Sequence, residues 1–326
     1  MTNSDLSKIK APINEELQNF NRLYKDSMKS SVTLVDLVTG YILKQKGKKI
    51  RPLLVLLSAK LCGGVTERSY RGAILVELLH TATLVHDDVV DDAKKRRGFP
   101  SINAIWKNKI AVLLGDYLLA KGLMLSVEGT DFDFLGIVTG TVKRMSEGEL
   151  LQISKTRKLN LDEETYFRII SDKTASLLAT CCEIGAHSAT ENEEKRQMMK
   201  EYGENLGMAF QIRDDILDLV GKTKIFGKDQ GGDIKEKKVT LPLLYAIKNS
   251  PEKESAEVIK AIKKGADGES VKKIIEFAVK YKGIEHAEQV AMEYALKAEK
   301  SLEKFEDSPE KESLMSLLHF VVERNK

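Results

Sequence analysis

The sequence predicts an all-α fold: a single domain, residues 1–326, built as a bundle of long, mostly antiparallel helices around a central cavity. The six prolines leave residues 101–241 without any, whereas a β-rich segment of that length would need turn residues throughout. Apolar residues recur at helical spacing in one segment after another. The chain contains no alternating strand pattern, no sequence repeat and no linker rich in Gly, Ser or Pro.

The expected helices follow one another along the chain. An apolar stripe at i, i+4, i+8 spacing predicts a helix that ends near residue 90, and it comprises Ile74, Leu75, Leu78, Ala82, Val85 and Val89. Residues 110–128 form a more uniformly apolar helix, of the type buried in a bundle or at a subunit interface. Residues 163–185 and 193–220 are two further helical stretches. Beyond Pro251, alternating charged and apolar residues predict amphipathic surface helices.

Composition excludes several classes of protein. A hydrophobic fraction of 42% is enough for a core, and Lys+Arg 52 against Asp+Glu 49 gives a net charge of +3, too balanced for a nucleic-acid binder. Three cysteines, two of them adjacent, cannot form a disulfide framework or a spaced zinc site. No uninterrupted apolar run of ~18 residues and no signal peptide are present. We therefore expect a cytoplasmic protein without a transmembrane segment.

The strongest local signal is HTATLVHDDVVDDAKKRRG, residues 80–98. Four aspartates within residues 87–92 repel one another unless a cation neutralises them. On a helix Asp87 and Asp91 lie ~40° apart, with His80 between them in angle. A solvated acidic helix end is the simpler alternative. An EF-hand is excluded, because the sixth position from Asp87 is Asp92 rather than Gly and the twelfth is Gly98 rather than Glu.

A second acidic cluster, MAFQIRDDILD, repeats the spacing at Asp214, Asp215 and Asp218. Gly207, Gln211, Asp214 and Asp218 fall within ~60° of one another on an ideal helix, and Gly207 leaves the acidic face without side-chain bulk. Two such clusters facing each other could hold several Mg²⁺ ions through carboxylates, with positions left for phosphate oxygens and water.

Basic residues supply the charge that would complement an anionic ligand. They occur in GKKIRP (residues 47–52), in Arg96-Arg97, in Lys173-Thr174, and as six lysines within residues 222–238, which include Lys228 and Lys238. A lysine-rich loop alone is more often solvated than functional. A P-loop at Gly221-Lys222-Thr223 is excluded, because the upstream glycine position is Ile216 and a helix precedes it.

These segments together resemble the trans-polyprenyl diphosphate synthase family of class I isoprenoid synthases. The matching elements are GKKIRP, HTATLVHDDVVDDAKKRRG, DKTA at 172–175, FQIRDDILD and GGDIKEKKVTLP. The resemblance implies a Mg²⁺-dependent transferase that condenses isopentenyl diphosphate with an allylic diphosphate. It also implies a homodimer, with peripheral membrane contact for release of a hydrophobic product.

Residue roles follow from the same resemblance. The catalytic set comprises Asp87, Asp88, Asp91, Asp214, Asp215, Asp218 and Lys173, with Asp87, Asp91, Asp214, Asp88 and Asp218 as metal ligands. The allylic diphosphate site comprises Arg96, Lys173, Thr174, Gln211, Lys228 and Lys238, and the isopentenyl diphosphate site comprises Lys48, Arg51, His80 and Arg97.

Product length depends on the residues just before the first acidic cluster. Family members with bulky aromatic residues there block the hydrocarbon channel, whereas Ala82 and Thr83 are small. Ideal helix geometry favours Thr83 as the channel residue, since it lies one turn below Asp87, while Ala82 also belongs to the apolar stripe. The prediction is a medium- or long-chain synthase. A farnesyl or geranylgeranyl diphosphate synthase, a class I terpene cyclase and a non-catalytic partner subunit are the alternatives.

Overall fold

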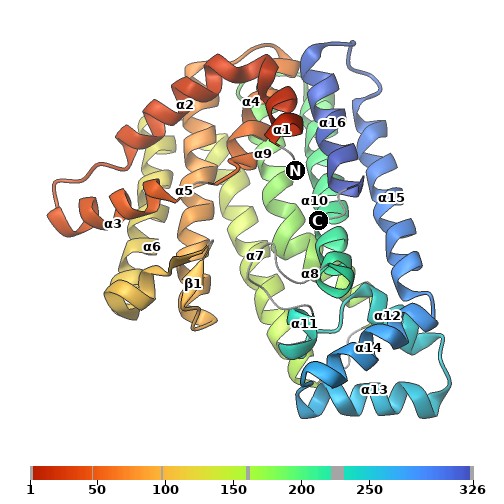
Figure 1. Cartoon of the computed structure of the whole chain (residues 1–326). Helices are drawn as coiled ribbons and strands as arrows, with labels where there is room; N and C mark the ends of the chain where they lie inside the picture. Colours follow the sequence, from red (N-terminus) through yellow and green to blue (C-terminus); the bar gives the residue numbers. More distant parts are fainter. Residues whose placement is uncertain (1–2, 46, 97, 159–161, 222–230, 324–326) are drawn as a thin grey trace.

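The computed structural model describes residues 3–45, 47–96, 98–158, 162–221 and 231–323. Figure 1 shows long helices that run side by side, with shorter helices packed at both ends of the bundle. The first half of the chain contains α1 (Asn3–Lys10), η1 (Ala11–Ile13), α2 (Asn14–Ser27), α3 (Thr33–Lys44), α4 (Ile50–Cys62), α5 (Glu67–Val90), α6 (Ile102–Glu128) and α7 (Phe132–Lys158).

The second half is also helical. It contains α8 (Glu163–Ile170), the π-helical turn η2 (Ser171–Ala175), α9 (Ser176–His187), α10 (Glu193–Val220), α11 (Gly232–Lys235), α12 (Leu241–Lys248), α13 (Glu252–Lys264), α14 (Gly268–Lys280), α15 (Gly283–Leu302) and α16 (Pro309–Glu323). The prediction of an all-α fold is confirmed.

The strands described in this structure form one short hairpin directly after the first acidic cluster. Strand β1 (Lys95–Arg96) pairs antiparallel with β2 (Phe99–Pro100), with Arg96 opposite Phe99. Gly98 has a φ of +82°, a conformation that glycine adopts without steric cost. The hairpin turns the chain back toward α5, and α6 begins directly after it.

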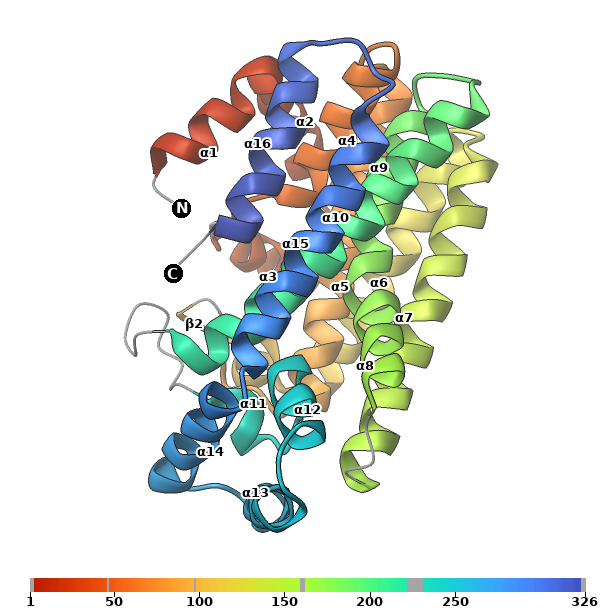
Figure 2. The ribbon, with the colours of Figure 1, turned by 90° about the vertical axis from the view of Figure 1, so that its right-hand side faces the viewer.

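An ion-pair network shows which helix ends lie together. Arg68, near the start of α5, donates from Nε to Asp131 just before α7 at 2.9 Å and from Nη1 to the carbonyl of His187, the last residue of α9, at 2.7 Å. Helix α10 begins a few residues later, at Glu193. The starts of α5, α7 and α10 therefore lie at one end of the bundle, and their carboxyl ends point to the other, where α11 to α14 pack (Figures 1 and 2).

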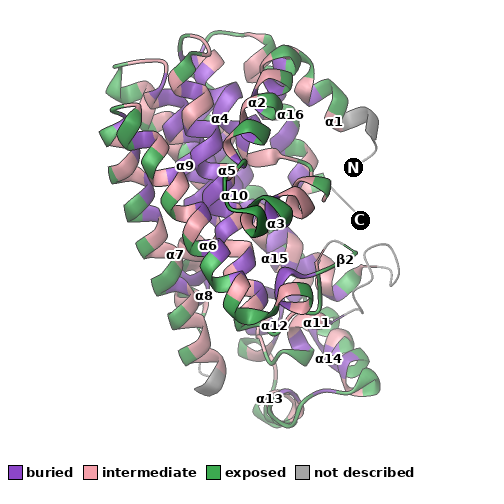
Figure 3. Ribbon diagram, turned by 90° about the vertical axis from the view of Figure 1, so that its left-hand side faces the viewer, coloured by how far each residue is buried: buried purple, intermediate pink, exposed green. Residues whose placement is uncertain are grey.

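The core lies on α4, α5, α9 and α10, where buried residues are concentrated in Figure 3. Helix α4 is buried along most of its length because Leu53, Leu54, Val55, Leu56 and Leu57 are all fully covered. Helix α9 approaches it closely, since a Cβ atom at Gly185 would lie 2.4 Å from the Val55 carbonyl oxygen. Most of the predicted apolar stripe of α5 is buried here as well.

Helix α6 is the most apolar long helix and keeps one side exposed. Val112, Leu113, Met124 and Val127 are each 40% or more exposed. Among the described helices, only α6 is long and apolar enough to cross a membrane by length and composition, and 33% of its most apolar window is buried. The sequence pattern identifies residues 110–128 of this helix as uniformly apolar, although they contain no uninterrupted apolar run of ~18 residues. Helix α6 packs along α5 in the bundle (Figure 1).

Predicted helix positions agree closely with the structure, with two refinements. Helix α10 spans residues 193–220 as expected. The helical stretch over residues 163–185 is interrupted by the π-helical turn η2. Helix α4 begins at Ile50, so Pro52 is its third residue, where the missing N–H would have no partner within the helix. The three cysteines are buried and free, in agreement with the predicted absence of a disulfide framework.

Candidate active site

The two acidic clusters occupy the last turns of α5 and α10, at the same end of the bundle. Asp87 and Asp91 end α5, and Asp214 and Asp218 lie near the end of α10. The carboxyl end of a helix carries a partial negative charge, so carboxylates are electrostatically unfavourable there without a cation. This placement reduces stability and therefore favours a functional explanation over a solvated helix end.

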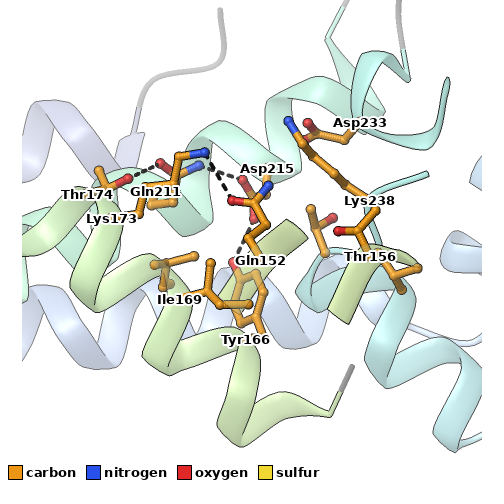
Figure 4. A pocket seen from close by; sticks show the side chains of 13 residues that line it. Gln152, Thr156, Tyr166, Ile169, Lys173, Thr174, Gln211, Asp215, Asp233 and Lys238 are labelled. Atoms are coloured by element: carbon orange, nitrogen blue, oxygen red, sulfur yellow. Dashed lines mark hydrogen bonds between the residues drawn. The ribbon is translucent and has the colours of Figure 1, made fainter. Parts of the chain in front are cut away.

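A cavity lies beside the second cluster, between the ends of α7, α8, η2 and α10 and residues 233–240 (Figure 4). Its lining comprises Gln152, Thr156, Tyr166, Ile169, Ile170, Lys173, Thr174, Gln211, Asp215, Asp233, Lys238, Val239 and Thr240. Five of the predicted site residues thus line one cavity, although they come from three parts of the chain: Lys173, Thr174, Gln211, Asp215 and Lys238.

A chain of hydrogen bonds fixes one wall of this cavity. Thr174 Oγ1 donates to Gln211 Oε1 at 2.9 Å, Gln211 Nε2 donates to Asp215 Oδ1 at 2.8 Å, and Tyr166 donates to Asp215 Oδ2 at 2.7 Å (Figure 4). Burial and the negative charges of Asp233 and Asp214 raise the pKa of Asp215 to about 8, although both hydrogen bonds favour the carboxylate. Asp215 thus orients Gln211 and Thr174 from inside the protein.

Lys173 connects the two acidic clusters. Its Nζ lies 2.5 Å from Glu149 Oε2 and donates to Gln152 Oε1 at 3.1 Å. Burial raises the pKa of Asp87, and the charges of Glu149 and Asp91 raise it further, whereas Lys173 and Arg96 lower it. Asp87 therefore lies within the electrostatic reach of Lys173, which places the first cluster beside the cavity of the second.

Lys238 provides an independent link between the clusters. Burial lowers its pKa, but hydrogen bonding to Glu236 and the charges of Glu236, Asp233 and Asp91 outweigh this, so the pKa is raised overall. Lys238 lines the cavity beside Asp215 and is also close enough to Asp91 to be stabilised by it. Lys173 and Lys238 therefore lie within electrostatic range of Asp87 and Asp91, respectively, and line the same cavity as Asp215 of α10.

Two predicted metal ligands have protein partners in this structure. Asp88 is buried, and its Oδ1 accepts from Arg96 Nε at 2.6 Å. Asp218 accepts from the backbone amides of Gly232 and Asp233, each at 3.1 Å. Asp218 therefore holds the start of α11 against α10. Within the first cluster, Asp87 and Asp91 remain the stronger candidates for direct metal contact.

A second cavity lies beside α5, and one of the four residues predicted for the isopentenyl diphosphate site lines it. Its lining comprises Tyr24, Ile42, Leu43, Gln45, Gly47, Lys49, Glu77, His80, Thr81, Leu84, Val85, Asp88, Arg96, Ser101 and Ile102. His80 is that residue. Arg96, predicted for the allylic site, also lines this second cavity, while its charge still lowers the pKa of Asp87.

The remaining predicted residues are less directly placed. Lys48 is exposed and Arg51 is half-buried at the start of α4. Ala82 is buried in the main core, and Thr83 is half-buried with its hydroxyl donating to the His80 carbonyl at 2.9 Å. Neither residue lines the two cavities. Arg97 and Lys228 lie outside the described residues.

The structure adds site residues that the sequence analysis did not single out. Tyr166, Glu149 and Gln152 contact Asp215 or Lys173, and Asp233 lines the cavity. Asp233 belongs to the quoted GGDIKEKKVTLP segment, so its acidity was a usable signal. Tyr166, Glu149 and Gln152 lie in amphipathic helices, where periodicity alone does not separate a cavity residue from a surface residue.

The donor chemistry of the site fits a hard divalent cation. Asp215 and Asp233 line the first cavity, and Asp87 and Asp91 of α5 lie within electrostatic range of its lysines, so carboxylate oxygens are the donors on offer. Within the described ranges, no three acidic, His or Cys side chains lie close enough to ligate one ion. A cation held here would therefore need oxygen ligands from outside the protein, such as those of a diphosphate.

Comparison with known proteins settles the family. The model of the family described as polyprenyl synthetase matches residues 32–278, which include both acidic clusters and the whole lining of the two cavities except Tyr24. The chain belongs to the polyprenyl synthetase family. The prediction of a chain-elongating prenyltransferase is confirmed, and its all-α fold is that of the family's solved structures.

Two proteins that match this chain over nearly its full length are named for medium- and long-chain products. The chain is 33% identical to octaprenyl diphosphate synthase of Haemophilus influenzae, over 100% of this chain and 98% of that protein. It superimposes on a decaprenyl diphosphate synthase from Rhodobacter capsulatus with a TM-score of 0.92, 34% identity and coverage of 98% and 99%.

Two further similarities concern ligands and product class. A polyprenyl synthase from Caulobacter crescentus, complexed with calcium and isoprenyl diphosphate, gives a TM-score of 0.91 at 35% identity, with 98% of each chain covered. A short chain isoprenyl diphosphate synthase of Methanothermobacter thermautotrophicus is 34% identical over 87% of this chain and 88% of that protein.

Proposed function

We propose that this polyprenyl synthetase, acting as a single 1–326 domain in the cytoplasm, adds isopentenyl diphosphate to an allylic diphosphate in a Mg²⁺-dependent reaction and makes a medium- or long-chain all-trans polyprenyl diphosphate. The convergence of the acids of α5 and α10 on a space that contains Lys173 and Lys238 carries the proposal. Prenyl diphosphate synthases are in general metal-dependent, and the C. crescentus relative was crystallised with a divalent cation and an isoprenyl diphosphate.

The allylic diphosphate binds in the first cavity. Lys173, Lys238 and Gln211 donate to its oxygens, and Thr174 lies beside them with its hydroxyl donating to Gln211 Oε1. The Asp215–Tyr166 pair keeps Gln211 oriented. Separate Mg²⁺ ions, held by Asp87 and Asp91 of α5 and by Asp214 of α10 with help from Asp88 and Asp218, would neutralise diphosphate charge and so favour departure of the leaving group. Charge-assisted donors stabilise the same developing negative charge.

Isopentenyl diphosphate binds beside the second cavity, which His80 lines. Lys48 and Arg51, near the start of α4, are its further expected contacts, together with Arg97, which lies outside the described residues. The C–O bond of the allylic substrate ionises, and the C3–C4 double bond of isopentenyl diphosphate attacks the resulting allyl cation. Loss of a proton then gives an allylic diphosphate that is one isoprene unit longer. Because no side-chain nucleophile is required, the protein contributes proximity, orientation and exclusion of water.

A short-chain farnesyl or geranylgeranyl diphosphate synthase is the alternative, and the similarity to a short-chain archaeal enzyme favours considering it. The test is one incubation of the purified protein with isopentenyl diphosphate, a short allylic primer and Mg²⁺, followed by chain-length analysis. The expected product has well over four isoprene units and disappears with EDTA. Failure to elongate any allylic primer would contradict the proposal and point to a non-catalytic subunit.

Replacing Lys173 with methionine should mainly weaken binding of the allylic substrate. The substitution keeps most of the side-chain volume but removes a charge-assisted donor, and such contacts contribute ~1.5–3 kcal/mol, or roughly 10- to 100-fold in KM. The KM for isopentenyl diphosphate should stay within about twofold. Arg97→Ala is the reciprocal variant and should raise that KM selectively. Equal increases of both KM values in either variant would contradict two separate diphosphate sites.

The homodimer is proposed from the exposed apolar side of α6. Large apolar surfaces are uncommon on monomers, and symmetric dimers cover them with the same surface of a second copy. Leu113→Glu should convert a dimer to a monomer in sedimentation velocity at micromolar concentration, because Leu113 is 56% exposed there. Leu296→Glu is the matched control on α15, since Leu296 is 57% exposed and lies elsewhere on the surface. A monomeric, fully active wild type would contradict the dimer.

A further inference from the structure

The turn that carries Lys173 and Thr174 is unusual for a helical protein. Residues Ser171–Ala175 form a π-helical turn between α8 and α9. Such turns add a residue to the regular repeat, are rare, and occur frequently at functional sites. They cost more than the α-helix that the same residues could form, so surrounding contacts must select them. The structure contains such contacts on two sides of the turn.

An ion-pair cluster holds the first residues of the turn. Arg144 of α7 donates from Nε to Asp172 Oδ1 at 2.9 Å and from Nη2 to Ser171 Oγ at 2.8 Å. The same guanidinium donates from Nη2 to Glu204 Oε1 at 2.9 Å, and Glu204 also accepts from Ser171 Oγ at 2.5 Å. Because a guanidinium donates in a fixed planar fork, Arg144 sets the turn relative to both α7 and α10.

The electrostatics of this cluster are favourable. Burial lowers the pKa of Arg144, but hydrogen bonds and charge from Glu204 and Asp172 outweigh this and raise it. The side chains of Asp172 and Glu204 are 16% and 26% exposed, so solvent screens their contacts with Arg144 only in part. The cluster is a partly buried network, and one guanidinium satisfies two carboxylates that would otherwise repel each other.

Backbone packing confines the turn independently of these charges. A Cβ atom at Gly148 of α7 would lie 2.9 Å from Asp172 Cβ, and one at Gly207 of α10 would lie 2.4 Å from Ala175 Cα. Gly148 is one helical turn after Arg144, and Gly207 is about one turn after Glu204. The same faces of α7 and α10 thus supply both the cluster and the close backbone contact. Gly207 lacks a side chain, as the sequence analysis noted, and this lets α10 approach Ala175 of the turn closely.

Held in this way, the turn directs its next two residues into the first cavity. Lys173 contacts Gln152 and Glu149, and Thr174 contacts Gln211. Figure 4 shows Lys173, Gln152, Thr174 and Gln211 in this cavity. Arg144 and Glu204 do not line that cavity. We propose that Arg144 and Glu204 are positioning residues for prenyl transfer: they select the π-helical turn that aims Lys173 and Thr174 at the allylic diphosphate. This inference rests on the proposed role of Lys173 in binding that substrate.

The test uses Arg144→Gln, Arg144→Lys and Glu204→Gln in the full-length protein. The matched control is Lys200→Gln, which removes the 3.0 Å ion pair between Lys200 of α10 and Glu183 of α9, one turn before Glu204. We expect Arg144→Gln to raise the allylic KM about tenfold with the isopentenyl diphosphate KM within about twofold. Glu204→Gln should also raise the allylic KM, but by less than Arg144→Gln. Arg144→Lys should restore part of the loss, and Lys200→Gln should change neither KM.

Melting temperatures separate positioning from stability. A purely structural role predicts that Arg144→Gln lowers the melting temperature as Lys200→Gln does, with both KM values unchanged or raised equally, and this result would overturn the proposal. If Arg144→Gln does not fold, the two KM values of Glu204→Gln decide between the two roles, because the amide keeps the shape of the carboxylate and most of its hydrogen bonds.

A double variant tests whether the effect passes through Lys173. In a Lys173→Met background, Arg144→Gln should raise the allylic KM by less than about threefold further, because the group it positions is already absent. A full, multiplicative effect in that background would overturn positioning through Lys173. If Lys173→Met alone leaves the allylic KM unchanged, the proposed substrate role of Lys173 fails, and this inference fails with it. If only the Arg144 and Glu204 variants lack an effect, the proposed function stands and the positioning role is wrong.

Discussion

Asp87→Ala and Asp214→Ala should each lower turnover by about two to three orders of magnitude or more while the protein stays folded. Each removes a carboxylate from the space shared by α5 and α10, where the diphosphate charge must be neutralised before the C–O bond can ionise. Because both acids lie at the negative end of a helix dipole, their loss should not reduce thermal stability greatly, and Asp87→Ala is expected to increase it slightly. Steady-state turnover at saturating substrates and a melting curve for each variant measure these effects.

The matched control is Asp92→Ala. Asp92 belongs to the same acidic run but is 74% exposed at its side chain and pairs with Lys94 at 2.6 Å, away from the cavities. This substitution changes the net charge as the others do and should leave turnover within about twofold. If metal binding is what the acids provide, high Mg²⁺ should recover part of the activity of Asp87→Ala and none of the activity lost in Lys173→Met. Near-normal turnover in folded Asp87→Ala would remove the first cluster from the mechanism.

The helices could be predicted from the sequence because apolar residues in a long amphipathic helix recur with the 3.6-residue repeat of the α-helix. The apolar stripe of α5 and the bounds of α10 required only that period and the positions of proline and glycine. The acidic clusters were equally visible, since like charges at i, i+4 spacing have no structural explanation of their own. The family's motifs then added expected roles for individual residues.

Tertiary partners could not be predicted in the same way. The period of a helix identifies a face but not what the face contacts, so nothing in the sequence showed that Asp218 accepts from the amides of Gly232 and Asp233. The π-helical turn at Ser171–Ala175 has no distinguishing residue pattern, because it depends on Arg144 and Glu204 from two other helices. Burial of Ala82, in contrast, agrees with its place in the predicted apolar stripe of α5.

The second large effect is expected on product length, from Thr83→Phe. If the hydrocarbon chain grows antiparallel to α5, a helix of about 20 residues offers ~30 Å of channel, or roughly six to eight isoprene units of about 4–5 Å each. Thr83 lies four residues before Asp87, only ~6 Å along the helix axis. A phenyl ring there would meet the product after the first additions. Small Ala82 and Thr83 leave that path open in the wild type.

Thr83 and Ala82 should now respond differently to the same substitution. Ala82 is 2% exposed and belongs to the main core, so Ala82→Phe should cost about 1–3 kcal/mol in the free energy of unfolding through overpacking, besides any effect on product length. Thr83 is half-buried, and its hydroxyl bonds only the His80 carbonyl within its own helix. Thr83→Phe should therefore remain folded, which makes it the more informative variant.

The measurement is the chain-length distribution of wild type, Thr83→Phe and Thr83→Val under excess isopentenyl diphosphate. Thr83→Val removes the hydroxyl at nearly constant volume, so it should give the wild-type product and show that size is what matters. Thr83→Phe should release a product of about three or four units while the first condensation stays within about threefold of the wild-type rate, because a short primer ends before the ring. If the wild type itself stops at three or four units, the medium- or long-chain proposal is wrong. If Thr83→Phe leaves the length unchanged, the channel does not follow the Asp87 face of α5, and the residue that limits elongation lies on another helix.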